Sequence, residues 1–160
     1  MGLVLDSSVL IAAERAVRTV SGLLTTLECE HGETEIVLSS ITAIELEHGL
    51  HRAQTAEQTR KRREYLDTVF AAVPVEPFTK AMAQLAAKVD AEARQLGRTI
   101  PFADLLIGAT SLHFGDAVGT LNLRHFEMVP NLTVYATHPD IRAAWDQGMS
   151  AHIAELTRDV

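Results

Sequence analysis

The amino-acid sequence predicts a single α/β domain in which a parallel sheet is covered by helices on both faces. Two observations support this prediction. Short apolar runs alternate along the chain with longer segments whose apolar residues have helical spacing, as in proteins with parallel strands. In addition, 160 residues, of which 47% are hydrophobic and 22% charged, suffice for one domain with a buried core.

The first strand is expected at residues 3–5, and it leads directly into Asp6 and a helical pattern. Asp6 therefore stands at the carboxyl end of a strand. In open α/β sheets, ligands bind at this edge because the strands stop and the loops diverge there. Two interpretations of Asp6 remain open at this point. It caps the helix that begins near Ser8, or it binds a cation in the crevice.

Residues 9–31 are expected to form two helices, ended by the pair His31 and Gly32. Their expected buried positions are Leu10, Ile11, Leu23, Leu24 and Leu27. The next strand covers residues 35–38, and Ser39 and Ser40 are candidate N-caps for a helix from Ile41 to about His51.

This helix carries two acids, Glu45 and Glu47. Its apolar positions Ala43, Leu46 and Leu50 have the spacing of one helix face. Glu45 lies within the apolar run, whereas Glu47 projects nearer to His51, four residues on. Helix geometry alone does not decide which of the two acids faces the crevice.

A further helix is expected at residues 56–72, with the densest positive cluster of the chain at residues 60–63 (RKRR). The cluster has two interpretations, a solvated helix face or a local contact with RNA or a partner. After it come a short strand at 72–75 and a helix from Phe78 to about Leu96, ended by Gly97.

The last helix of the pattern runs from Pro101 to Phe114, with proline in its first turn, and strands are expected at 117–120 and 132–135. This helix is apolar nearly all round and should be largely buried, with Phe102 among its buried residues. Asp104 is the exception. The helix dipole favours an acid in the first turn, yet a buried carboxylate also needs a compensating charge, which a metal ion would supply.

Asn122 again follows a strand, so Asp6, Glu45, Asp104 and Asn122 are expected to approach one crevice. Oxygen ligands without histidine or thiol suit Mg²⁺ or Mn²⁺ better than zinc.

Four segments in this order resemble the PIN-domain ribonuclease toxins of the VapC family, from VapBC toxin–antitoxin pairs. They are residues 5–11 (LDSSVLI), 45–49 (ELEHG), 104–109 (DLLIGA) and 120–126 (TLNLRHF). The resemblance covers roughly residues 2–136, and its second motif selects Glu45 over Glu47. It implies a PIN-like domain, with a central parallel sheet of about five strands between helices, and a homodimer. It also implies a cognate VapB-type antitoxin that wraps the helices near the site and blocks the metal crevice.

The implied activity is metal-dependent hydrolysis of RNA phosphodiester bonds. Asp6, Glu45 and Asp104 would hold Mg²⁺ or Mn²⁺, with Ser7 holding Asp6 in place, and Thr120 and Asn122 orienting water or the scissile phosphate. Many PIN domains have a fourth acid where this chain has Asn122. Because Asn lacks the charge that draws in a second divalent ion, one metal ion is expected.

The remaining sequence features narrow the class of protein. A single cysteine, Cys29, and the lack of a signal-peptide pattern predict a cytoplasmic protein, and no apolar stretch is long enough to span a bilayer. The net charge of −7 argues against a nonspecific nucleic-acid coat. We expect the PIN domain to cover residues 1–137, and residues 138–160, which include Trp145, to form a C-terminal helical extension packed on it.

The sequence also bears on two rival functions. The haloacid dehalogenase pattern requires a second acid two residues after the first, where this chain has Ser8. A catalytically silent PIN-fold module that binds RNA or protein is the stronger alternative, and a nuclease assay discriminates it. Scattered histidines are more often structural, so His48, His113 and His125 are assigned no chemistry.

Overall fold

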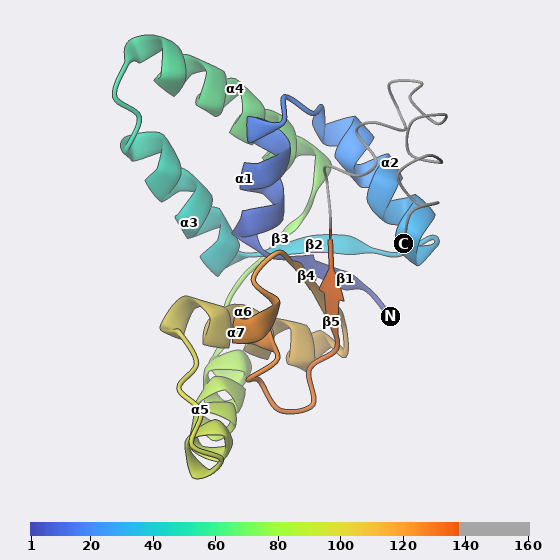
Figure 1. Cartoon of the computed structure of the whole chain (residues 1–160), viewed down its shortest axis with the longest axis vertical. Coiled ribbons are helices and arrows are strands. Elements are labelled where there is room, and N and C mark those ends of the chain that lie inside the picture. Colours follow the sequence, from blue (N-terminus) through green and yellow to red (C-terminus); the bar gives the residue numbers. More distant parts are fainter. Residues whose placement is uncertain (138–160) are drawn as a thin grey trace, which may run out of the picture.

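The computed structural model describes residues 1–137, in which five parallel strands and seven helices form a layered α/β domain (Figure 1). The elements, in chain order, are β1 (Leu3–Leu5), α1 (Ser7–Arg15), α2 (Val20–His31), β2 (Ile36–Ser39), α3 (Ser40–His51), α4 (Ala56–Ala72), β3 (Val75–Glu76), α5 (Lys80–Gln95), α6 (Phe102–Phe114), β4 (Ala117–Thr120), α7 (Leu123–Phe126) and β5 (Val134–Ala136).

The sheet order is β3-β2-β1-β4-β5, and all neighbours are parallel. The chain therefore builds outward from β1 to β2 and β3, and then crosses to the other side of β1 to add β4 and β5. The reversal falls between β1 and β4. In open parallel sheets this switch point leaves a crevice outside the carboxyl ends of the strands, and Asp6 lies there, with its backbone N–H donating to the carbonyl of Gly119 (2.9 Å).

The three central strands β1, β2 and β4 are buried on both faces, which explains why they are mostly apolar, whereas the edge strands β3 and β5 are partly exposed. Leu3 and Leu5 of β1 pack into a core formed with α1 to α4, whereas Val4 between them packs against Ile107 of α6 and Phe126 of α7. Figure 1 shows α1 to α4 on one side of the sheet and α5 to α7 on the other. The predicted fold class is confirmed.

Several local predictions are also confirmed. Ser39 caps α3, since its hydroxyl accepts the backbone N–H of Thr42 (3.0 Å). The side-chain hydroxyl of Thr42 donates to the carbonyl of Leu5 (3.1 Å). The start of α3 is thereby tied to the end of β1. Gly97 follows α5 with φ of +72°, a left-handed conformation that favours glycine.

Other boundaries differ from the sequence prediction. The strand expected at 72–75 is displaced to Val75–Glu76, because α4 continues through Ala72 and Pro74 has no N–H to donate. The last strand begins two residues later than expected, at Val134, and the single-turn helix α7 was not predicted. Pro101 occupies the N-cap of α6 rather than its first turn.

Three residues that we expected to be buried are not. Phe102, the first residue of α6, is 74% exposed, although Ile100 before it and Leu105 after it are buried against α5, so its side chain faces away from the core. Ile11 and Leu24 are only partly buried and pack against the margin of the core around α1 and α2.

The predicted C-terminal helical extension, residues 138–160 with Trp145, lies outside the described residues. Within residues 1–137, no helix is long and apolar enough to cross a membrane.

The basic cluster of α4 (residues 60–63) is engaged in ion pairs. Arg60 pairs with Glu64, Lys61 with Glu57, Arg62 with Glu14 and Arg63 with Glu47. This arrangement favours the interpretation of the cluster as a solvated, ion-paired face.

Arg62 makes the most extensive of these contacts and joins three helices. Its guanidinium donates to both carboxylate oxygens of Glu14 in α1 (2.8 to 3.2 Å) and to the carbonyl of Gly49 in α3 (2.9 Å). Both side chains are mostly shielded, with 26% and 21% exposure, so the pair is less screened than a surface salt bridge.

The first prediction compares the two neighbouring arginines. Arg62→Gln should lower the free energy of unfolding by about 1.5–3 kcal/mol, because it leaves a shielded carboxylate and a carbonyl without their charged donor. Arg63→Gln removes the more exposed pair, which solvent screens, and should lower the free energy of unfolding by clearly less than Arg62→Gln. Urea unfolding of both variants tests this, and equal losses would show that Arg62 does not lock the three helices.

Candidate active site

Asp6 is the most deeply buried acid of the crevice, with 2% of its surface exposed. It occupies the N-cap position of α1, but its side chain makes no capping hydrogen bond. Instead, its Oδ2 atom accepts hydrogen bonds from the hydroxyls of Ser8 (2.5 Å) and Thr120 (2.8 Å). Of the two interpretations of Asp6, the structure therefore disfavours helix capping.

The two hydroxyls that hold Asp6 are themselves fixed by the turn after β4. The backbone N–H of Leu121 donates to Ser8 Oγ (3.1 Å), and that of Asn122 donates to Thr120 Oγ1 (2.9 Å). We expected Thr120 to orient water or the scissile phosphate, but its side chain is fully buried and its hydroxyl donates to Asp6 instead. The β4–α7 turn thus controls the orientation of the carboxylate on β1.

Glu45, on the first part of α3, is held by a different serine. Ser7 Oγ donates to Glu45 Oε2 (2.7 Å). We had expected Ser7 to hold Asp6, but consecutive helix residues point about 100° apart, so Ser7 faces α3 and Ser8 faces Asp6. Glu47 lies outside the crevice and makes a bidentate contact with Arg63 (both 2.9 Å).

Asp104, in the first turn of α6, is held by His125 of α7. The distance between His125 Nδ1 and Asp104 Oδ2 is 2.9 Å. An ionised Asp104 requires the histidine tautomer in which Nδ1–H donates. From the sequence we assign His125 no chemistry, because scattered histidines are more often structural; its partner Asp104 is 21 residues away and on another helix, so no local pattern indicates the contact.

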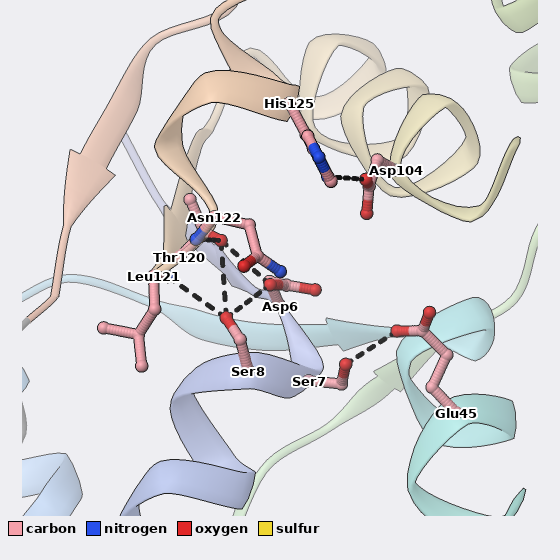
Figure 2. Close-up of polar contacts among 9 residues, drawn as sticks. All are labelled: Asp6, Ser7, Ser8, Glu45, Asp104, Thr120, Leu121, Asn122 and His125. Carbon is pink, nitrogen blue, oxygen red and sulfur yellow. Dashed lines mark hydrogen bonds and ion pairs between the residues drawn. The ribbon is translucent and has the colours of Figure 1, made fainter. Parts of the chain in front are cut away.

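The three carboxylates share one pattern of contacts. In each, one oxygen is engaged, namely Asp6 Oδ2, Glu45 Oε2 and Asp104 Oδ2, while within residues 1–137 the other oxygen accepts no hydrogen bond. Figure 2 shows the three side chains around a common space, with Asp6 between the other two and the amide of Asn122 beside it. Each held oxygen fixes the side chain and leaves the other oxygen available to a ligand.

The crevice concentrates negative charge. Burial raises the pKa of Glu45, and the nearby charges of Asp6 and Asp104 raise it further, against the lowering effect of Ser7. Burial and then Asp6 also raise the pKa of Asp104, although His125 opposes them. Like charges at low exposure lower the stability of the metal-free protein, so the crevice favours a cation.

The donor set fits a hard divalent cation, since the free atoms are carboxylate oxygens. Within residues 1–137, no three His, Cys, Asp or Glu side chains are arranged as a ready-made metal site.

The comparisons with known proteins agree with this fold. The sequence profile of the PIN domain family matches residues 3–131. The chain therefore belongs to the PIN domain family.

Among curated proteins it is similar to "Ribonuclease VapC1" of Rickettsia felis and "Ribonuclease VapC" of Rickettsia bellii. Each is 28% identical over 134 residues, which cover 84% of this chain and 95% of the relative. Among solved structures, VapBC2 from Rickettsia felis, bound to a promoter DNA fragment, superposes with a TM-score of 0.75 at 21% identity, covering 86% of this chain and 100% of the other. FitAcB from Neisseria gonorrhoeae gives 0.71 at 23%, covering 86% and 97%.

The second prediction concerns the charge of the crevice in chelator. A raised pKa means that the folded state binds more protons than the unfolded state between the two pKa values, so Glu45 lowers stability as pH rises through that interval. Glu45→Gln should therefore be more stable than the wild type at neutral pH, with the difference vanishing below the ordinary value of 4.5.

Glu47→Gln is the matched control, because Arg63 lowers the pKa of Glu47 and the sign is reversed. The contribution of Glu47 is present at neutral pH and lost as pH falls, so this variant should be slightly less stable than the wild type at neutral pH. Urea unfolding at several pH values measures both. A Glu45→Gln variant less stable than the wild type at neutral pH would contradict the charge assignment.

Proposed function

We propose that this protein is a Mg²⁺- or Mn²⁺-dependent endoribonuclease that hydrolyses RNA phosphodiester bonds, and that it is the toxin of a type II toxin–antitoxin pair. The observation that carries the proposal is the convergence of Asp6, Glu45 and Asp104 at the switch point, each with one oxygen held and one free. The similarity to proteins named Ribonuclease VapC supports the substrate class.

In this proposal Asp6 and Asp104 bind the metal, and Glu45 binds it or positions a water. A divalent cation at this place supplies Lewis-acid chemistry, acidifying water and neutralising charge on the phosphate. Ser8 and Thr120 hold Asp6, Ser7 holds Glu45, and His125 holds Asp104. Asn122 is exposed at the crevice margin, where its amide can hold a water or a phosphate oxygen. Because Asn122 is neutral, we propose a single tightly held ion.

The proposed partners follow from the same similarity. Solved structures with this fold include VapBC toxin–antitoxin complexes. We propose a VapB-type antitoxin that brings an Arg or Lys into the carboxylate crevice, since a cation there relieves the same charge as a metal ion. We also propose that the toxin forms a homodimer and acts on RNA in the cytoplasm.

The third prediction tests the activity directly. Cleavage of single-stranded RNA should require Mg²⁺ or Mn²⁺ and stop in excess chelator. Asp6→Asn and Asp104→Asn should each lower the cleavage rate by more than ~10–100-fold, the loss expected when a residue that only hydrogen-bonds a metal ligand is removed. Gel analysis of a labelled RNA pool provides the measurement.

Glu47→Gln is the control, because it removes an acid from the same helix, α3, but outside the crevice. It should cleave like the wild type. Full cleavage in chelator would contradict the metal-dependent mechanism. A folded wild type that binds RNA but never cleaves it would favour the catalytically silent binding module.

The fourth prediction concerns Thr120 as a positioning residue for Asp6. Thr120→Val removes the donor to Asp6 and the acceptor for the N–H of Asn122, so metal affinity should fall about 10–100-fold. Thr120→Ser keeps the hydroxyl and should restore most of that affinity. Calorimetric titration with Mn²⁺ measures it, and equal losses in both variants would show that the hydroxyl does not position Asp6.

A further inference from the structure

A groove runs along α1 beside the carboxylate crevice. Its volume is about 670 Å³, within the ~300–1,000 Å³ typical of ligand pockets. It lies between α1 and the β4–α7 turn, and its lining residues are Ser7, Ser8, Ile11, Ala12, Arg15, Ala16, Leu121 and Asn122. Because Ser7, Ser8 and Asn122 also border the carboxylates, the groove is continuous with the crevice.

The far end of the groove carries a positively charged side chain, Arg15, that has no partner among residues 1–137. Arg15 is exposed and makes no hydrogen bond or ion pair with any residue in 1–137. This distinguishes it from the basic cluster of α4, whose members all have carboxylate partners. In a chain with a net charge of −7, a free guanidinium beside an acidic crevice is a specific attraction for phosphate.

The spacing along α1 places this cation beyond the reacting position. Seven residues separate Ser8 from Arg15, which corresponds to about 10 Å along a helix. A phosphate held at Asp6 is therefore not the one that Arg15 contacts, and the next phosphate along a strand is the natural partner.

The near end of the groove has an apolar surface. Leu121 is 37% exposed, and Figure 2 shows its side chain directed away from Asp6. Its backbone is fixed by the hydrogen bond to Ser8, so the side chain is presented from a rigid turn. A base displaced from stacking would cover this surface, since every base has an apolar face.

Building on the proposed function, we infer that this groove binds the nucleotide adjacent to the scissile phosphate of a single-stranded RNA. Arg15 contacts the neighbouring backbone phosphate, and Leu121 packs against the base. A basic side chain laid in the groove itself would be repelled by Arg15, so the charge of this groove, unlike that of the carboxylate crevice, favours a phosphate.

The fifth prediction tests Arg15 with a charge-matched control. Arg15→Gln should raise the KM for RNA cleavage about tenfold with kcat little changed, and Arg98→Gln, which removes an exposed arginine from the loop after α5, should leave both unchanged. In chelator, binding of a fluorescein-labelled single-stranded RNA should weaken by a similar factor. The slope of log affinity against log salt should fall by about 0.7 in magnitude, as for one lost phosphate contact to a single strand.

A labelled abasic strand separates the two contacts. The Leu121→Ser protein should bind normal RNA more weakly than the wild type does, but it should bind the abasic strand equally well. The Arg15→Gln protein should bind both strands more weakly than the wild type. If Arg15→Gln matches Arg98→Gln in RNA binding and KM, the inference is overturned, even if antitoxin inhibition changes. If the wild type never cleaves RNA but binds it, and Arg15→Gln weakens this binding, the proposed nuclease function is overturned and the groove remains an RNA-binding site.

Discussion

The placement of three carboxylates at one edge of a parallel sheet is the constraint on which the rest of the site depends. The strand reversal between β1 and β4 opens the crevice, and burial there makes the charges of Asp6, Glu45 and Asp104 mutually unfavourable. The surrounding polar groups relieve only part of this cost, since each engages one oxygen of an acid. The metal-free site is thus held in shape at the expense of stability.

The positive charges are placed according to whether they lie near the carboxylate crevice. The cations of α4 are paired with acids of α1, α3 and α4 itself, where they join helices and do not compete for the crevice. Arg15 remains available beside the crevice, in the groove along α1. An acidic chain can therefore attract a polyanion locally, because Arg15 lies beside the crevice without a carboxylate partner among residues 1–137.

Much of this architecture could be predicted from the sequence, since strand exits and helix starts are local patterns. Apolar runs ending in Asp6 and before Asn122, and an acid in the apolar helix at Asp104, indicated the crevice. What failed depended on tertiary contacts. Helix geometry alone could not separate Glu45 from Glu47; the family motif selected Glu45, and the pairing of Glu47 with Arg63 is a tertiary contact that the pattern does not show. The roles of Ser8 and His125 likewise depend on side-chain direction or on partners distant in sequence. Phe102 was misplaced because a helix that is apolar nearly all round does not show which of its sides meets a neighbour.

The central claim is that these carboxylates together hold one divalent cation, and titration of the metal-free protein with Mn²⁺ by calorimetry in two buffers of different ionisation heat tests it most directly. Cation binding should displace protons from acids whose pKa values are raised, so the apparent enthalpy should depend on the buffer at mildly acidic pH and less so as pH rises. The account predicts one saturable event with proton release that Asp6→Asn abolishes. Binding that survives Asp6→Asn, or no binding by the wild type, would contradict it.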